Sequence, residues 1–166
     1  MGTIDPGQLG RWFDAYGARL ALYGRHWLDA TQSEDVVQEV FIRLMAQPRS
    51  PENVKAWLFR SVRNGAISQL RRQKRRQKHT QELAVGRQSW FENRPDDLLD
   101  AKTAQQALVN LPEEQREIVI LRIWGQLTLR EITEIVEQPL STVHHKYQSA
   151  LKAIRIKMQA VGINDE

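Results

Sequence analysis

The stretch LPEEQREIVILRIWGQLTLREITEIVEQPLSTVHHKYQSALKAIRIKM, residues 111–158, decides the fold class of this chain. It opens with a proline just inside a first turn and two acids near the positive end of the helix dipole, which predicts a helix beginning there. We expect Gly125 to end that helix, because glycine adopts left-handed backbone geometry at little cost. A second short helix is expected from about Thr128, and Gln138-Pro139-Leu140 separates it from a third.

The third helix of this stretch is predicted to bury one side. Apolar residues recur there at steps of three and four, as in an amphipathic helix. They are Val143, Tyr147, Ala150, Leu151, Ile154, Met158 and Val161.

The opposite side of the same helix is basic and rich in hydrogen-bonding groups, and no acid occurs from Ser141 to Gly162. A short helix, a tight turn and a basic second helix are typical of a helix-turn-helix unit that enters the DNA major groove. The alternative is an ordinary solvated face of a three-helix subdomain. The missing acids favour DNA binding, since phosphates repel carboxylates. The side chains on this side are Thr142, His144, His145, Lys146, Gln148, Ser149, Lys152, Arg155 and Lys157.

The composition of the whole chain is that of a soluble globular protein. With 166 residues, 41% hydrophobic and 27% charged, the chain suits one domain or two small ones. A pI of about 9.6 indicates a polyanionic partner. The absence of cysteine excludes disulfides and thiolate metal sites. No apolar run approaches the ~20 residues that span a bilayer and no signal-peptide pattern is evident, so we expect no membrane insertion and a cytoplasmic protein.

Two amphipathic helices are predicted at the start of the chain. Asp5-Pro6 is a plausible start of the first, whose apolar stripe is Leu9, Phe13, Tyr16, Leu20, Tyr23 and Trp27. Ser33 is expected to cap the second. On the inner side of the second helix we expect Val36, Val37, Val40, Phe41 and Leu44. On its outer side we expect Asp35, Gln38, Glu39 and Arg43.

A third helix is expected from about Glu52 into a basic tract. Its apolar residues repeat at steps of four, so the buried face should wind slowly around the helix: Val54, Leu58, Val62, Ala66 and Leu70, with Trp57 and Ile67 beside them. Its other side carries Arg60, Ser61, Arg63, Asn64, Ser68, Gln69 and Arg71. The acid-free tract 71–78 is either a solvated helix end or a nucleic-acid tether, and the adjoining aromatic and basic residues favour the tether.

These patterns predict an all-α protein of two small helical domains. The first is expected to span residues 1–76 and the second, which contains the helix-turn-helix, residues 97–166. Residues 77–96 lose periodicity and are expected to form a flexible linker. Asp97 is a plausible cap for a helix that carries Leu98, Leu99, Ala101, Ala104 and Leu108.

Three segments, in order along the chain, resemble bacterial RNA polymerase sigma factors. Asp35 to Leu44 resembles their core-binding segment. Ala56 to Ile67, with the following Arg71-Arg72, resembles the segment that melts promoters and reads the −10 element. Leu111 to Glu117, with the turn at Ser141-Thr142-Val143, resembles the domain that reads the −35 element. The spacing is similar to that of the small two-domain group, the extracytoplasmic-function (ECF) sigma factors.

The resemblance implies three sets of binding residues. Polymerase would be bound by Asp35, Gln38, Glu39 and Arg43. The −10 element would be contacted by Arg60, Ser61, Arg63, Asn64, Arg71 and Arg72, where Asn64 matches a position that reads a base flipped from the stack. The −35 element would be contacted by Thr142, His144, His145, Lys146, Gln148, Ser149, Lys152 and Arg155, the last two at phosphates.

Sigma factors of this kind have no catalytic activity, so the resemblance implies no catalytic residue, cofactor or metal. The implied partners are core RNA polymerase and promoter DNA, and the resemblance leaves open whether an anti-sigma factor also binds.

The chain departs from the family pattern within the helix-turn-helix. His144-His145 stands where a basic residue followed by serine is frequent, Gln138 replaces a usual apolar residue and Thr133 a usual alanine. Glu137 occupies the usual glycine of the turn, and a non-glycine residue in left-handed geometry costs roughly 1 kcal/mol. The two histidines are adjacent and point in different directions along a helix, which argues against a metal site.

Two other functions compete with this interpretation. The first is a stand-alone helix-turn-helix regulator that binds DNA as a dimer, which is considered because the C-terminal unit also resembles the output domain of response regulators. It would leave residues 35–44 without a role, and no extra dimerisation helix is evident. A nucleic-acid hydrolase could use Asp35 and Glu39, which share a helix face, to hold Mg²⁺. No third acid or histidine lies at a supporting spacing nearby.

Overall fold

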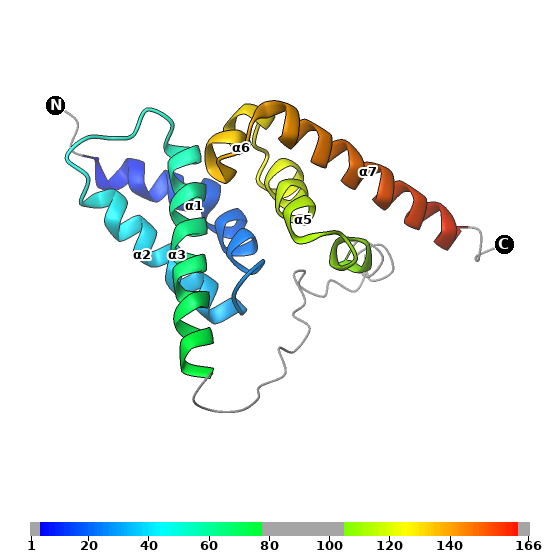
Figure 1. The fold of residues 1–166 in the computed structure, drawn as a ribbon. Helices are drawn as coiled ribbons and strands as arrows, with labels where there is room; N and C mark the ends of the chain where they lie inside the picture. Colours follow the sequence, from blue (N-terminus) through cyan, green and yellow to red (C-terminus); the bar gives the residue numbers. More distant parts are fainter. Residues whose placement is uncertain (1–3, 78–104, 163–166) are drawn as a thin grey trace. The chain divides into compact units, whose positions relative to one another are not determined.

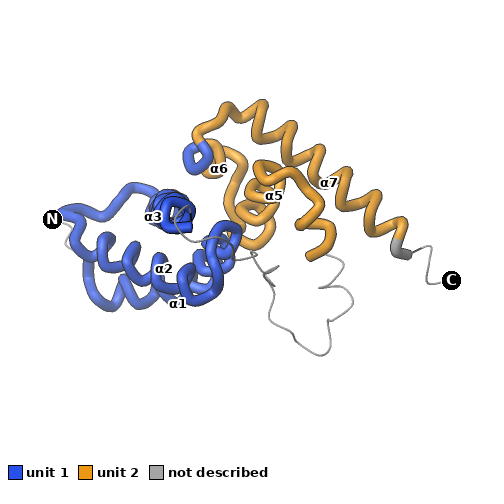
Figure 2. Tube along the Cα trace, turned by 60° about the horizontal axis from the view of Figure 1, so that its bottom comes forward, with its two compact units in different colours: residues 1–88, 134–136 blue, residues 89–133, 137–166 orange. Residues whose placement is uncertain are grey.

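The computed structural model describes residues 4–77 and 105–162, and every regular element within those ranges is helical (Figure 1). The chain divides into two compact units, which Figure 2 distinguishes by colour. Unit 1 comprises residues 1–88 and 134–136, and unit 2 comprises residues 89–133 and 137–166. The all-α prediction is confirmed. Residues 78–96 of the predicted linker and residues 97–104 of the helix predicted to begin at Asp97 lie outside the described residues, so the predicted domain boundaries stay predictions. Gln77, which was predicted to belong to the linker, is helical.

Unit 1 contains a bundle of three helices, α1 (Pro6–Gly24), α2 (Ala30–Met45) and α3 (Val54–Gln77). Each of the three packs against the other two. All five residues predicted to point inward from α2 are buried, and the four predicted to point outward are exposed. The largest fully buried side chains of the bundle are Leu20, Tyr23, Leu28, Val40, Leu44, Leu58 and Phe59.

Helix α1 begins as predicted, with Asp5 at the N-cap and Pro6 in the first turn. Its stripe is buried only in part, however. Phe13, which was predicted to point inward, is 48% exposed. Its ring meets that of Phe41 edge-on, with 5.1 Å between the centroids. Phe13 therefore packs on the outer side of the Phe41 ring. The residues of the stripe that are fully buried in the core are Leu20 and Tyr23.

The expectation that Ser33 caps α2 is wrong. Asp29 is the N-cap: its carboxylate accepts from the Gln32 backbone N–H at 2.8 Å, and the Gln32 side chain accepts from the Asp29 N–H. This reciprocal capping box satisfies two helix-end donors at once. Ser33 is instead buried within the helix, where its hydroxyl donates to the Ala21 carbonyl of α1. A Cβ on Gly24 would overlap that hydroxyl, so glycine there permits the close approach of α1 and α2.

Helix α3 begins at Val54, slightly later than predicted, because the Asn53 side chain accepts from the Ala56 N–H at 3.0 Å. It continues without a break to Gln77, so residues 71–77 of the basic tract are helical. Phe59 is fully buried although it lies outside the predicted stripe. The predicted stripe advances about 40° around the helix with each four-residue step. Phe59 lies on the side toward which the stripe advances, so the buried face is wider than the stripe and includes this residue.

In unit 2, helical residues 105–109 precede α5 (Glu113–Val119), a π-helical turn η2 (Ile120–Trp124), α6 (Leu129–Val136) and α7 (Leu140–Gly162). The last three residues of α6, 134–136, belong to unit 1. Helix α5 packs against α7. The fully buried side chains of these elements include Ile118, Val119, Leu121, Leu127, Ile132, Val143 and Ala150.

Gly125 follows the π-helical turn, but the predicted reason for glycine there is wrong. Its φ is −71°, in the right-handed region, and the left-handed residue is Gln126 with a φ of +56°. The Gly125 N–H donates to the Ile120 carbonyl at 2.9 Å, a π-type bond five residues back. A Cβ at Gly125 would lie 2.5 Å from the Leu121 carbonyl oxygen. Close backbone approach, and not a left-handed φ, therefore requires glycine.

The turn between α6 and α7 has the geometry expected from the sequence. Thr128 caps α6 in a reciprocal capping box with Glu131, close to the predicted start. Glu137 has φ 56° and ψ 45°, so a non-glycine residue does occupy the left-handed position. Pro139 then precedes the first residue of α7, Leu140.

The predicted buried stripe of α7 holds only in its first half. Val143 and Ala150 are buried, but Met158 is 48% exposed. Helix α7 has 23 residues, about 34 Å of axis, whereas α5 and the π-turn together have about half that length. The neighbouring helix is too short to cover the end of α7, and the apolar stripe there meets solvent. The Val161 side chain lies outside the described residues.

Candidate nucleic-acid interface

Helix α7 presents an exposed polar face. His144, His145, Gln148, Lys152 and Arg155 are all exposed. At about 100° per residue they fall within roughly 100° of one another around the helix, on the side away from buried Val143 and Ala150. Imidazole and amide groups donate and accept hydrogen bonds, and the cations suit phosphates. The structure therefore joins five of the eight residues predicted for this surface into one continuous face.

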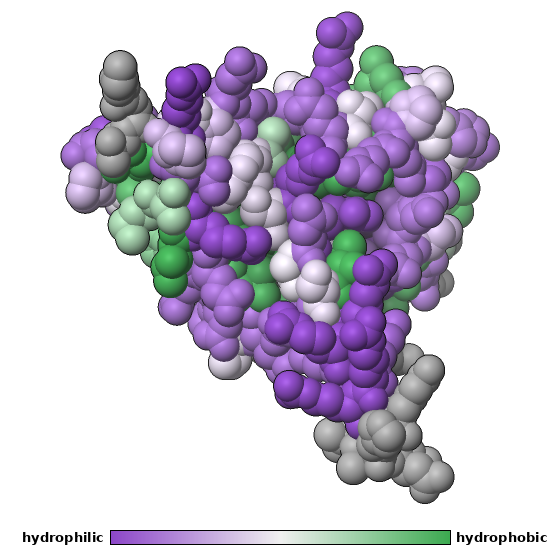
Figure 3. Space-filling model, turned by 60° about the vertical axis from the view of Figure 1, so that its left-hand side comes forward, coloured by the Kyte–Doolittle hydropathy of each residue, from purple (hydrophilic) through white to green (hydrophobic). Residues whose placement is uncertain are grey.

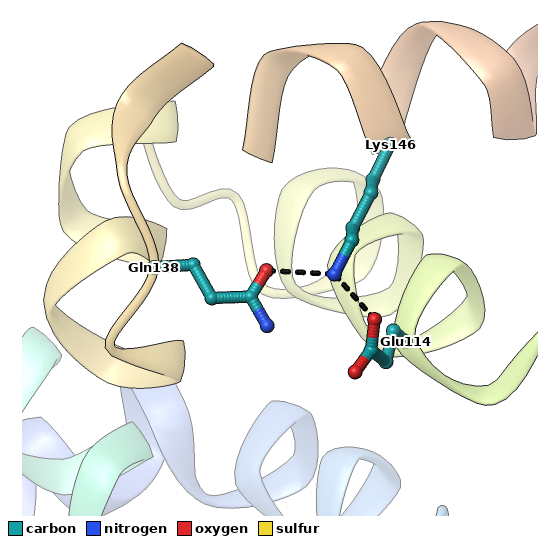
Figure 4. A network of polar contacts seen from close by, with 3 residues as sticks. All are labelled: Glu114, Gln138 and Lys146. Atoms are coloured by element: carbon teal, nitrogen blue, oxygen red, sulfur yellow. Dashed lines mark hydrogen bonds and ion pairs between the residues drawn. The ribbon is translucent and has the colours of Figure 1, made fainter. Parts of the chain in front are cut away.

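The other three residues predicted for α7 lie at the edge of this face or away from it. Thr142 and Ser149 are half-buried and flank the exposed side. Lys146 lies about 120° around the helix from Lys152, next to the buried side. Its side chain is only 22% exposed and forms an ion pair with Glu114 in the first turn of α5 (Figure 4). Its ammonium also donates to the Gln138 side-chain oxygen at 2.9 Å.

A second polar face runs along α3. Arg60, Asn64 and Arg71 are exposed and lie within about 40° of one another around the helix axis, over a length of about 17 Å. Arg63 is half-buried and lies about 60° to one side. Ser61 and Arg72 lie about 100° or more to the other side, so the structure does not bring all six predicted residues onto one face.

The continuous helix adds two cations that sequence reasoning did not assign to this face. Lys74 and Arg75 are exposed and continue the line of Arg60 and Arg71 around α3. Extending the 100° rotation through the basic tract would have identified them. Figure 3 shows strongly hydrophilic side chains gathered toward the bottom of the view, and the last turn of α3 contributes Lys74, Arg75 and Arg76 to the charged surface.

Helix α2 carries a third exposed face, of mixed charge. Asp35, Gln38, Glu39 and Arg43 are exposed, and the buried residues on the opposite side fix the rotation of the helix. Ile42 lies among them and is 61% exposed, which is high for isoleucine. Met45, one turn further along the helix, is 53% exposed as well, so this face combines exposed apolar side chains with polar and charged ones, as protein interfaces do.

Residues 4–77 and 105–160 contain no cluster of three or more histidine, cysteine, aspartate or glutamate side chains suited to a metal ion. In those parts of the chain, no helix is both long and apolar enough to cross a membrane.

Comparisons with known proteins identify the family of two stretches of the chain. Residues 12–76 match the family Sigma-70 region 2, and residues 102–154 match Sigma-70, region 4. The chain is 31% identical to RNA polymerase sigma factor SigV of Bacillus subtilis, over 75% of this chain and 74% of that protein. It is 32% identical to ECF RNA polymerase sigma factor ShbA of Streptomyces griseus, over 74% of this chain and 69% of that protein. The chain belongs to the ECF family of RNA polymerase sigma factors.

The fold of this ECF sigma factor is also that of a solved relative. The sigma factor RpoE of Bartonella quintana, in a co-crystal structure with the anti-sigma factor NepR, superimposes with a TM-score of 0.66 at 20% identity. The match covers 90% of this chain and 95% of that one. Sigma factors are regulatory initiation factors, and this one acts in promoter-specific transcription initiation with RNA polymerase.

Proposed function

We propose that this sigma factor binds core RNA polymerase through α2, reads the −10 element through α3 and reads the −35 element through α7, and that α3 assists strand separation. The observation that carries the proposal is the exposed face of α7, in which imidazole, amide and cationic groups lie together in a helix without acids from residue 141 to 160. Phosphate neighbours exclude carboxylates, and base edges require side chains that donate and accept hydrogen bonds.

Within that face, the first turns of α7 are the base readers. In helix-turn-helix proteins the N-terminal residues of the recognition helix reach the base edges. His144, His145 and Gln148 are exposed there. Thr142 and Ser149 flank them with hydroxyl groups suited to bases or phosphates. Lys152 and Arg155 lie one to three turns further along and suit the phosphate backbone.

The −10 role of α3 is supported by its length and chemistry. An exposed amide at Asn64 can pair with the edge of an unstacked base, while Arg60 and Arg71 on the same face hold phosphates. Arg63 on one side and Arg72 on the other add positive charge beside that face, and Ser61 adds a hydroxyl group. Opening a base pair costs a few kcal/mol, which such contacts offset.

The polymerase role of α2 is supported by a rigid scaffold beneath an exposed surface. Val36, Val37 and Val40 are nearly or fully buried, so the outward residues are held in fixed positions. Asp35, Gln38, Glu39 and Arg43 then provide a polar rim around the exposed Ile42. An apolar centre with a polar rim is how stable protein interfaces are built.

The test of the polymerase role is a pull-down of bacterial core RNA polymerase with the double variant Gln38→Ala, Glu39→Ala. We expect its affinity for core to fall about 30-fold or more, since interface residues that matter cost 1 kcal/mol or more each when truncated. Both side chains are exposed, so the fold should be unaffected. Asp14→Ala, an exposed acid of α1, is the matched control and should bind like wild type.

Equal binding by wild type and the double variant would exclude α2 as the docking surface. Failure of the wild type itself to bind core would instead favour a stand-alone DNA-binding regulator.

Strand separation is tested with Asn64→Ala in the holoenzyme, the sigma factor bound to core. The template is the selected promoter, defined as the sequence that wild-type holoenzyme enriches from a library of duplexes randomised in the −10 and −35 elements. We expect initiation on the duplex to fall about tenfold, because a lost base contact costs roughly 1–3 kcal/mol. On the same promoter with a mismatched, pre-melted −10 segment, most of the defect should disappear, because no base pair then has to be opened.

Asn110→Ala, an exposed asparagine of unit 2, is the control and should leave both templates unaffected. A defect of equal size on both templates would place Asn64 in binding of the −10 strand itself and not in the opening of base pairs.

An anti-sigma partner and a cytoplasmic location belong to the same proposal. The solved relative RpoE is in complex with an anti-sigma factor. Met45 follows Ile42 on α2 and is 53% exposed, so this helix offers apolar area to a competing protein. A protein bound there would exclude polymerase.

A further inference from the structure

Lys146 links three parts of unit 2 (Figure 4). It belongs to α7, and its ammonium lies between the carboxylate of Glu114 in α5 and the side-chain amide of Gln138 in the turn before α7. Gln138 directly follows Glu137, the residue in left-handed geometry. One side chain therefore connects α7 to the start of α5 and to the turn that sets its direction.

The chemistry of this contact leaves Lys146 poorly suited to DNA. An ammonium has three donors, and two are used within the unit. Glu114 supplies a full opposite charge, and the positive end of the α5 dipole favours a carboxylate at that position. A phosphate would have to displace this carboxylate to bind the ammonium.

The position of Lys146 on the helix agrees with its chemistry. Its side chain is 22% exposed, whereas His144, His145 and Gln148 are exposed. Lys146 lies about 160° around the helix from Gln148, the middle of the exposed face. When the face centred on Gln148 meets DNA, Lys146 is directed toward α5.

We propose that Lys146 is a positioning residue for −35 recognition: paired with Glu114 and Gln138, it fixes the rotation and entry of α7, and it does not itself contact DNA. This inference rests on the proposed function. Recognition groups must be held to within about 0.5 Å by supporting contacts, so a loosened α7 should lose both affinity and base preference.

The test is a charge exchange between positions 114 and 146. Holoenzymes with Lys146→Glu, Glu114→Lys and the double exchange are compared on the selected promoter, with the wild-type holoenzyme as reference. Apparent Kd is measured by fluorescence anisotropy over a series of salt concentrations, and base preference by repeating the library selection. Circular dichroism defines a temperature at which every variant is folded. The Gln138 amide can turn to donate to a carboxylate at residue 146.

If Lys146 positions α7, each single exchange brings two like charges together and weakens binding about tenfold, with a broadened −35 preference. The double exchange should return Kd to within about threefold of wild type and restore the preference. A residue that served stability alone would not change base preference in folded protein.

If Lys146 contacts a phosphate, the outcomes reverse. Glu114→Lys would then strengthen binding by releasing Lys146 and adding a cation, and the double exchange would stay as weak as Lys146→Glu. The salt slope is an independent readout, because each lost phosphate contact lowers its magnitude by about 0.9. We expect Lys146→Met, which keeps the aliphatic stem, to weaken binding without changing the slope; a slope reduced by about one overturns the proposal.

Lys146→Met also serves if Lys146→Glu does not fold. If the wild-type holoenzyme enriches no −35 sequence at all, the proposed function fails and this inference fails with it. Enrichment by the wild type without rescue by the double exchange overturns the inference alone.

Discussion

The double variant His144→Ala, His145→Ala is expected to reduce transcription from the selected promoter about 30-fold or more while leaving the capture of core polymerase unchanged. Both imidazoles are exposed on the face of α7 that the proposal directs into the major groove. A side-chain contact to a base edge contributes about 1–3 kcal/mol to discrimination, and two single contacts at the lower limit give roughly 30-fold. The fold should persist, since neither side chain is buried.

The measurement is run-off transcription on the selected promoter beside a core pull-down. Gln106→Ala, an exposed residue of unit 2 outside α7, is the matched control and should transcribe like wild type. Transcription that stays within threefold of wild type would remove the histidines from base reading. Loss of core capture would show that α7 acts on polymerase and not on DNA.

Phe59→Ala is expected to destabilise unit 1 by about 3–5 kcal/mol, the usual cost of deleting a fully buried phenylalanine. Phe59 is 0% exposed and its ring lies 5.7 Å from that of Tyr23. Small domains have only about 5–15 kcal/mol of stability in total, so much of unit 1 should open transiently. Hydrogen exchange of α1 and α3 amides should accelerate roughly 100-fold or more. Binding of core should weaken because α2 loses its support.

Phe13→Ala removes the same atoms from the same unit and provides the control. Phe13 is 48% exposed and contacts Phe41 edge-on, so the expected cost is about 1 kcal/mol. Equal acceleration of exchange in the two variants would contradict the assignment of Phe59 to the core.

The sequence predicted the helices best where apolar spacing was regular. The inward and outward sides of α2 are as expected, because a helix with five large apolar residues on one side can bury only that side. The left-handed residue at Glu137 was expected from its place in the turn, and the structure confirms it. The outward sides of α3 and α7 were expected in outline, since the buried stripe determines which residues remain outside.

The errors arose where one residue type serves several structural purposes. Serine caps helices, but it also forms interhelical hydrogen bonds, and Ser33 does the latter because Asp29 and Gln32 already cap α2. Glycine permits a left-handed φ and also close packing, and Gly125 is used for packing against the Leu121 carbonyl. A local pattern does not contain the distances to other backbone atoms that distinguish these uses.

Sequence by itself determined the all-helical class, the order of the two family regions and most of the exposed residues of the three proposed faces, because these depend on spacing within one helix. Tertiary structure decided the role of Lys146. Its sequence position predicts a DNA contact, yet its partner Glu114 lies 32 residues away in another helix. Which of several cations in a recognition helix faces DNA, and which is paired inside the fold, depends on how α7 packs against α5. Packing of distant segments is decided by the whole core and cannot be obtained from the spacing of residues along one helix.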